Sequence, residues 1–136
     1  MIHRHPIRVY YEDTDLAGIV YYANYLRFLE RGRSEMVRDA GISQVEMKAQ
    51  GLVFAVRRVE ADYLKPAHFE DLLTVETRCV ALKGASFDMP QRVLRGDQVL
   101  LEAVVKVVVL NAAGRATRLP ADIRAKLETI LANDGE

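Results

Sequence analysis

The residues best suited to chemistry lie between Tyr11 and Tyr25, where carboxylates, a glycine and several tyrosines crowd together just before a helical pattern. A helix N-terminus offers unpaired N–H groups and a partial positive charge, which stabilise a developing oxyanion. A carboxylate just upstream, such as Asp15, could attack a carbonyl or activate a water to do so. The segment therefore predicts a hydrolytic site. On the residues alone, Asp13 and Asp15 could equally be turn and capping residues without chemistry.

The elements that would hold this segment are indicated by hydrophobic periodicity. A strand is expected over 7–12, which is rich in β-formers. A helix is expected from about Tyr22 to Asp39, because apolar residues recur there at three- and four-residue spacing. Gly32 lies in the middle of that helix, where glycine costs about 1 kcal/mol relative to alanine. We therefore expect the helix backbone to pass close to a sheet at Gly32.

Four further strands are expected after the helix, at about 53–63, 73–81, 87–95 and 101–109. A closing helix is expected from Pro120 to about Leu131, since proline suits the first helical position. This order predicts an α+β fold in which one long central helix is wrapped by a curved, mainly antiparallel five-stranded sheet. No linker or repeat divides the sequence, so we expect a single domain over residues 1–136.

Composition narrows the class of protein. Half of the 136 residues are hydrophobic, which is enough for a core without disulfides or metals. Nineteen basic residues balance nineteen acidic ones, which argues against a nucleic-acid partner. Cys79 is the only cysteine, and the three histidines do not group with a carboxylate at ligand spacing, so no metal site is expected. The sequence shows neither a signal peptide nor an apolar run of ~20 residues, and we expect a cytoplasmic protein without a membrane span.

The segment around Asp15 resembles the signature of the 4-hydroxybenzoyl-CoA thioesterase family, in the hotdog superfamily. The matching positions are Asp13, Asp15, Gly18, Val20, Tyr22, Tyr25, Glu30 and Arg33, with further agreement at Val59, Tyr63, Pro66, Asp71, Val75 and Thr77. Within the family, the run from Val9 to Asp15 is most similar to the YbgC-type, Tol–Pal-associated acyl-CoA thioesterases. The resemblance implies a hotdog fold and hydrolysis of an acyl-CoA thioester to a free acid and coenzyme A.

The resemblance also implies roles for particular residues. Asp15 would be the catalytic nucleophile or general base, and the backbone N–H at about Tyr22 would polarise the thioester carbonyl. Many YbgC-type proteins have a histidine where Tyr22 stands, whereas the 4-hydroxybenzoyl branch has a tyrosine. The candidate substrate-binding residues are Gly18 and Val20 in the motif, Val56, Arg57, Val59 and Tyr63 as a pocket wall from a second subunit, and Lys65 as a partner for the phosphates of coenzyme A.

No metal or resident cofactor is implied, because coenzyme A arrives as part of the substrate. A homodimer or homotetramer is expected, since a lone subunit leaves a sheet edge unpaired. Acyl carrier protein is a second possible acyl donor. The alternative function is a non-catalytic module that binds acyl-CoA or acyl carrier protein and supports envelope maintenance, which the tyrosine at position 22 would favour.

Overall fold

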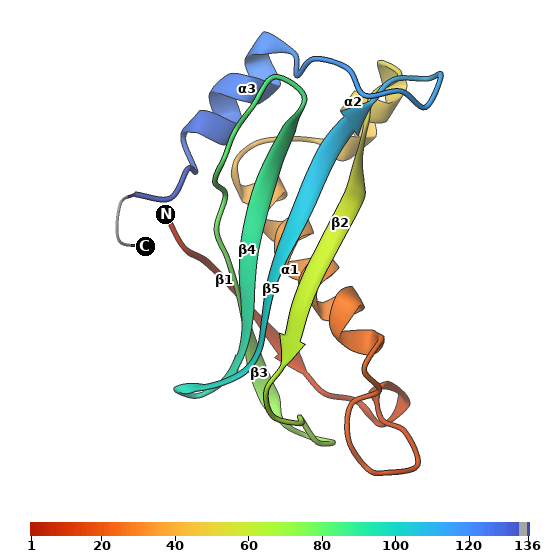
Figure 1. Cartoon of the computed structure of the whole chain (residues 1–136), viewed down its shortest axis with the longest axis vertical. Helices are drawn as coiled ribbons and strands as arrows, with labels where there is room; N and C mark the ends of the chain where they lie inside the picture. The colour runs from red at the N-terminus through yellow and green to blue at the C-terminus, as the bar shows by residue number, and fades with distance from the viewer. Residues whose placement is uncertain (134–135) are drawn as a thin grey trace.

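A five-stranded antiparallel sheet curves around one long helix in the computed structural model, which describes residues 1–133 and 136 (Figure 1). The strands are β1 (His3–Arg8), β2 (Val53–Tyr63), β3 (Leu72–Thr77), β4 (Ser86–Arg95) and β5 (Gln98–Leu110). The helices are α1 (Asn24–Asp39), α2 (Gln44–Ala49) and α3 (Ala121–Glu128), with a short 3-10 helix, η1, over Tyr11–Asp13. The expected α+β fold, with its central helix and five-stranded sheet, is confirmed.

The strands lie in the order β1-β3-β4-β5-β2, so the first two strands in sequence form opposite edges of the sheet. The chain crosses from one edge to the other through α1 and α2, which places α1 against the concave face (Figure 1). Strand β5 pairs with β4 on one side and with β2 along nearly its whole length on the other. Among the residues that the structure describes, β2 has no further neighbour, so its outer edge is unpaired.

The core forms where the apolar face of α1 meets the inner face of the sheet. The buried residues of α1 are Tyr25, Phe28, Leu29, Gly32, Met36 and Val37. They pack against inward-facing residues of the strands, among which Val75, Val93 and Leu101 are completely buried. None of the helices in the described part of the chain has the length and apolar character that spanning a bilayer requires.

A buried glutamine fixes the position of α1 on the sheet. Gln91, on β4, donates from Nε2 to the carbonyl oxygen of Leu29 and to Oγ1 of Thr77, both at 2.9 Å. Its Oε1 accepts a hydrogen bond from Arg33 at 3.1 Å, and burial lowers the pKa of that guanidinium. Every polar atom of the Gln91 side chain is thus paired, as a buried amide requires. The network ties the middle of α1 to two strands at once.

The close approach expected at Gly32 is confirmed. A Cβ atom at this position would lie 2.6 Å from Cγ1 of Val75 and 3.1 Å from Oγ1 of Thr77. Val75 is fully buried on β3, so it has no free space into which to move. The glycine is therefore required by the distance between helix and sheet, which explains its unfavourable place in mid-helix.

Gly32→Ala should destabilise the fold in spite of alanine's better helix propensity. Overpacking a tight core typically costs about 1–3 kcal/mol, and the propensity gain offsets ~1 kcal/mol of that. We expect a lower melting temperature by calorimetry or circular dichroism. Gly84→Ala is the matched control, because a Cβ at Gly84 would meet nothing within 4 Å. Equal melting temperatures for the two variants would contradict the steric explanation.

Two strands differ most from their expected bounds, and α3, expected from Pro120 to about Leu131, covers only Ala121–Glu128. The first strand covers residues 3–8 rather than 7–12, because the carboxylate of Asp13 accepts the N–H of Tyr10 at 2.8 Å and bends residues 11–13 into a 3-10 turn. The third strand ends at Thr77 rather than at Ala81, because Arg78 lies opposite Pro90, which accepts its N–H but has no N–H to donate in return. Pairing resumes only as a bridge between Val80 and Asp88. Both elements exist as expected, but their bounds differ.

Candidate active site

The loop that carries Asp15 is a tight turn at one end of the sheet. Thr14 and Val20 form an antiparallel bridge, and the N–H of Asp15 donates to the carbonyl of Ile19 at 3.0 Å. The N–H of Gly18 returns to the carbonyl of Asp15, also at 3.0 Å. Gly18 has a φ of +80°, a conformation that side chains other than glycine rarely adopt. Gly18 therefore allows the chain to reverse directly after Asp15.

Asp15 presents an exposed carboxylate from this turn. Its Oδ1 accepts the N–H of Ala17 at 2.9 Å, which orients the side chain within the loop. Its Oδ2 takes part in no protein hydrogen bond or ion pair among the described residues. Leu16, at the tip of the same loop, is completely exposed. The carboxylate is thus both positioned and available to an incoming group.

Asp13 has a different role, although it is only two residues away. Its side chain is buried, and its Oδ2 accepts the N–H of Tyr10. Its carbonyl oxygen accepts the N–H of Tyr21 and the Nδ2 group of Asn24, both at 2.9 Å. Asp13 therefore ties the 3-10 turn to the start of α1. Asp13 is thus a buried structural residue, whereas Asp15 presents an exposed charge.

The start of α1 is two residues later than the expected position, at Asn24. The N–H groups of Tyr22 and Ala23, just before it, donate to no protein acceptor in residues 1–133 and 136. The carbonyl of Tyr22 accepts the hydroxyl of Tyr63 at 2.9 Å, which fixes this peptide from the end of β2. Two free N–H groups at the beginning of a helix are suited to bind the oxygen of a polarised carbonyl.

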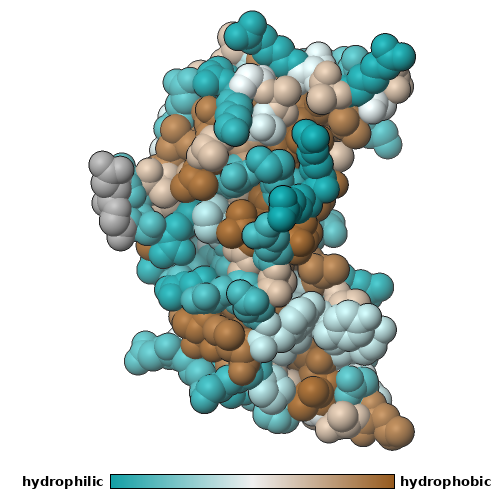
Figure 2. Space-filling model, viewed as in Figure 1, coloured by the Kyte–Doolittle hydropathy of each residue, from teal (hydrophilic) through white to brown (hydrophobic). Residues whose placement is uncertain are grey.

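Tyrosines surround this helix start. The ring centroids of Tyr21 and Tyr22 are 4.9 Å apart, those of Tyr22 and Tyr63 are 6.3 Å apart, and those of Tyr25 and Tyr63 are 5.5 Å apart. The hydroxyl of Tyr25 accepts the N–H of Ala67 at 3.0 Å inside the core. In Figure 2 the corresponding lower part of the surface carries pale and brown side chains close together.

The pKa values of Tyr21, Tyr25 and Tyr63 are raised by their surroundings. Burial raises the pKa of Tyr25, and burial together with the nearby Tyr22 raises that of Tyr63. The pKa of Tyr21 is raised mainly by its interactions with Tyr22, with smaller contributions from burial and from the negative charge of Asp15. The hydroxyl of Tyr63 donates to the carbonyl of Tyr22, whereas that of Tyr25 accepts the N–H of Ala67.

The segment between β2 and β3 forms backbone hydrogen bonds and a bridge with the loop that carries Asp15. The N–H of Val20 donates to the carbonyl of Ala67 at 2.9 Å, and Ile19 forms a bridge with His68. Asp71 stabilises this segment by accepting the N–H of His68 at 2.8 Å and Nη1 of Arg95 at 2.7 Å. Burial tends to raise the pKa of Asp71, but these two partners bring it below its ordinary value.

The sequence of this chain can now be compared with known proteins. The model of the "thioesterase-like superfamily" matches residues 9–127. The acyl-CoA thioester hydrolase YbgC of Escherichia coli is 39% identical over 127 residues, which cover 92% of this chain and 95% of that protein. The acyl-CoA thioesterase YbgC of Haemophilus influenzae is 39% identical over 122 residues, covering 88% and 90%. A probable thioesterase from Bartonella henselae superposes with a TM-score of 0.79 at 43% identity, covering 88% of this chain and 98% of that structure.

The chain belongs to the thioesterase-like superfamily. Its α+β architecture is the hotdog fold of that superfamily. The resemblance to the 4-hydroxybenzoyl-CoA thioesterase family and its YbgC-type members, inferred from the Asp15 segment, is confirmed.

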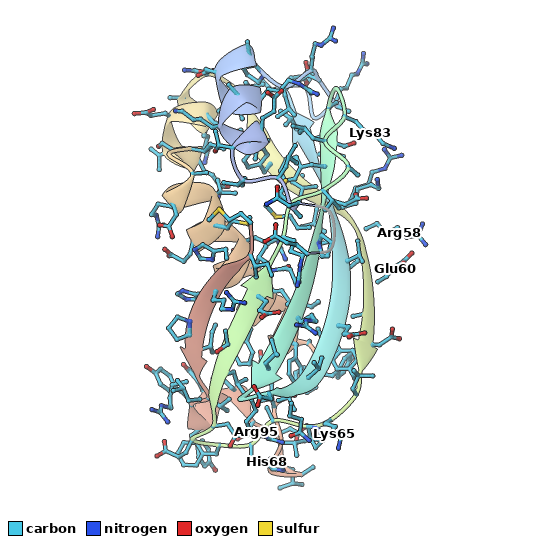
Figure 3. The ribbon with its side chains drawn as sticks, turned by 90° about the vertical axis from the view of Figure 1, so that its left-hand side faces the viewer. Arg58, Glu60, Lys65, His68, Lys83 and Arg95 are labelled. Carbon is cyan, nitrogen blue, oxygen red and sulfur yellow. The ribbon has the colours of Figure 1, made fainter. Side chains whose placement is uncertain are left out.

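The other residues expected at the site of this thioesterase-family chain lie on and beyond β2. The hydroxyl of Tyr63 donates to the carbonyl of Tyr22 at the start of α1. Val56, Arg57 and Val59 are exposed and lie nearer than Tyr63 to the other end of the edge strand β2. Lys65 is exposed at the same end of the molecule as His68 and Arg95 (Figure 3). Val56, Arg57 and Val59 are thus not brought to Asp15 within one chain.

A small cavity between α1 and β2 was not expected from the sequence. It has a volume of about 190 Å³, and Glu30, Arg33 and Val56 are among its lining residues. Its floor is formed by Phe54, Phe87, Met89 and Val107. In the sequence these four residues have the alternation of ordinary core positions, and nothing distinguishes them as cavity residues. The cavity begins about two helical turns along α1 from Tyr22.

Other nucleophiles and metal ligands give no competing site in residues 1–133 and 136. No three His, Cys, Asp or Glu side chains there are grouped to hold a metal ion. Cys79 is buried, and burial followed by the charge of Asp88 raises the pKa of its thiol to about 12. A thiol that stays protonated is not a nucleophile at neutral pH. Among the described residues, neither Cys79 nor a metal group therefore competes with the Asp15 segment as a candidate site.

Proposed function

We propose that this chain hydrolyses an acyl-CoA thioester to a free acid and coenzyme A, with Asp15 as its catalytic carboxylate. Two relatives of 39% identity are named as acyl-CoA thioester hydrolase or thioesterase, which supports the reaction class. The observations that support the residue assignment are the exposed carboxylate of Asp15 and the N–H of Tyr22, which donates to no protein acceptor among the described residues.

In the proposed reaction the carbonyl oxygen of the thioester accepts the N–H of Tyr22. As a general base, Asp15 takes a proton from a water whose oxygen attacks the carbonyl carbon. As a nucleophile, Asp15 would attack that carbon itself and form a mixed anhydride that water then hydrolyses. In both routes the carbon–sulfur bond breaks and the thiolate of coenzyme A leaves and takes up a proton. A thiolate is a stable leaving group, since a free thiol has a pKa of about 8.5.

The remaining candidates bind substrate in this proposal. Gly18 sets the turn that presents Asp15, and the buried Val20 anchors it. Lys65 pairs with a phosphate of coenzyme A, the acyl group enters between α1 and β2, and a second copy of the chain supplies Val56, Arg57 and Val59. The assembly is a homodimer, which can pair again into a tetramer. No resident cofactor or metal takes part.

Two finer parts of the proposal rest on resemblance alone. Acyl carrier protein is the other acyl donor to consider, because it carries the same thioester. The Tol–Pal association follows from the likeness of the run from Val9 to Asp15 to YbgC-type proteins.

A thiol-release assay tests the function directly. The chain is incubated with acyl-CoAs of increasing length and with aryl-CoAs, and free coenzyme A is measured over time. Saturable, enzyme-dependent release with at least one donor is the expected result. Tight binding by calorimetry with no release from any donor would instead show a binding module. The buried Cys79 thiol should contribute no background to a thiol-reactive dye.

A further inference from the structure

Two consecutive peptide groups before α1 carry the N–H groups of Tyr22 and Ala23, which have no acceptor in the described part of the chain. The carbonyl of Tyr21 accepts the N–H of Asn24 at 2.8 Å, a bond within the same turn. The carbonyl of Tyr22 accepts the hydroxyl of Tyr63 at 2.9 Å, from the end of β2, which lies beside this turn (Figure 1). A peptide group is planar and trans, so fixing its carbonyl oxygen also fixes the direction of its N–H. The first bond therefore orients the N–H of Tyr22, and the second orients that of Ala23.

We propose that Tyr63 is a positioning residue whose hydroxyl aims the Ala23 N–H as a second donor to the thioester carbonyl oxygen. The role rests on the proposed function, in which the Tyr22 N–H is the first donor. Successive free N–H groups at a helix N-terminus point toward the same ligand, so both can reach one oxygen. A hydrogen bond to a carbonyl also polarises its peptide group, which strengthens the N–H of that group as a donor. Tyr63 thus acts through the peptide between Tyr22 and Ala23 and does not touch the reacting atoms.

Packing holds the Tyr63 ring in place for this role. Its centroid lies 5.5 Å from that of Tyr25 and 6.3 Å from that of Tyr22, both in edge-to-face geometry. Tyr25 is buried, so it forms a fixed wall for the ring. The two residues that follow Tyr63 both donate their N–H groups to the carbonyl of Leu100, at 2.8 and 3.1 Å. The hydroxyl is therefore carried by a side chain that is fixed by its ring contacts and by the backbone after it.

The hydroxyl of Tyr63 also keeps the proton that it donates. A tyrosine has an ordinary pKa of about 10. Burial, followed by the nearby Tyr22, raises the pKa of Tyr63 further. Since a phenol loses its proton only as the pH rises toward its pKa, the bond to the Tyr22 carbonyl should persist throughout the neutral range.

Two other roles for Tyr63 predict different kinetics. A side chain that only stabilises the fold would lower the melting temperature and leave the activity per folded molecule unchanged. A side chain that only contacts the bound substrate would raise KM. A group that strengthens a donor to the developing oxyanion would lower kcat and kcat/KM together. The kinetic constants therefore separate the three roles.

Tyr63→Phe removes the hydroxyl and keeps the ring. We expect kcat for the best acyl-CoA donor to fall about three- to tenfold, because one neutral hydrogen bond has a modest net worth. KM should stay within about twofold of the wild type. A wild-type kcat in this variant, or a loss that appears only in KM, would overturn the positioning role.

Tyr25→Phe is the matched control, because it removes a hydroxyl from the same group of rings. That hydroxyl accepts the N–H of Ala67 inside the core, so its loss leaves a buried donor without a partner. We expect a lower melting temperature, with kcat within about twofold of the wild type. A kcat loss in Tyr25→Phe as large as that in Tyr63→Phe would show that any disturbance of the rings slows the reaction, which would also overturn the role.

A double-mutant cycle identifies the peptide group through which Tyr63 acts. Ala23→Pro deletes the N–H that Tyr63 is proposed to aim. In the Ala23→Pro background, Tyr63→Phe should cost less than about twofold in kcat, since the donor that it serves is already absent. Residues that act independently would instead show additive losses. Additive losses would therefore overturn the assignment of the Ala23 N–H.

Chemical shifts give a measurement that needs no turnover. In Tyr63→Phe, loss of the hydrogen bond should move the carbonyl carbon resonance of Tyr22 and the amide proton resonance of Ala23. The amide proton of Tyr22 should move less, because the neighbouring Tyr21 carbonyl keeps its own bond to Asn24. Unmoved resonances of the Tyr22–Ala23 peptide would overturn the role even if kcat falls.

The wild type separates this inference from the proposed function. A wild-type chain that releases no coenzyme A from any donor would overturn the proposed function, and the role of Tyr63 with it. Release by the wild type together with an unaffected Tyr63→Phe variant would overturn the role of Tyr63 alone.

Discussion

Asp15→Asn should abolish thioester hydrolysis and leave the fold intact. Asparagine has the shape of aspartate, and its Oδ1 can still accept the N–H of Ala17, so the turn should persist. It cannot act as a carboxylate nucleophile, and it is too weak a base to deprotonate water. A general base alone is typically worth about 10²–10⁴ in rate. The loss should appear in kcat, because binding of the coenzyme portion does not use this carboxylate.

Asp13→Asn is the matched control for this experiment. It removes a carboxylate from the same loop, while its amide oxygen can still accept the N–H of Tyr10. We expect a lower melting temperature at most, with activity per folded molecule within about threefold of the wild type. Should Asp15→Asn also turn over its best acyl-CoA within about threefold of the wild type, Asp15 has no catalytic role.

Tyr22→Pro should have the second largest effect, because proline deletes the N–H proposed to bind the carbonyl oxygen. Removing one such donor typically lowers the rate by about 10²–10³. Tyr22→Phe keeps the N–H and should retain much of the turnover, since the proposed polarising group is the backbone N–H and not the side-chain hydroxyl. Steady-state kinetics on purified, folded variants would measure both, with circular dichroism as the check on folding.

Ala23→Pro places the same ring at the start of α1, but it removes the neighbouring free N–H and keeps that of Tyr22. The φ of Ala23 is −72°, close to the value that proline requires, so the ring fits the existing backbone. We expect it to be more active than Tyr22→Pro by at least about tenfold. If Tyr22→Pro folds and matches the wild-type rate, the helix terminus takes no part in the reaction.

The sequence predicted well those features that depend on local periodicity. The bounds of β2 and the end of α1 at Asp39 agree with expectation, and so does the close contact at Gly32. Periodicity also placed β3 correctly up to Thr77. It could not predict the end of the strand at Thr77, because that depends on Pro90 lying opposite Arg78 in the folded sheet.

The division of roles between Asp13 and Asp15 could not be predicted from spacing. Both are acidic residues in one turn, and only the folded loop shows that one is buried among backbone donors and the other exposed. The network of Gln91 was missed for a related reason. Its partners Leu29, Arg33 and Thr77 are distant in sequence, so no local pattern connects them. Tertiary packing decides such contacts.

The crowding of tyrosines around the start of α1 gives the protein an unusual optical property. The chain has no tryptophan, and all six of its tyrosines lie in residues 10–25 or at the end of β2. Its intrinsic fluorescence and near-ultraviolet dichroism therefore originate mainly at that end of the molecule. Ligand entry beside Asp15 should change this emission without any added label. Loosening of α3, which contains no tyrosine, should leave the tyrosine emission nearly constant. Emission therefore reports on the candidate site and not on the opposite end of the molecule.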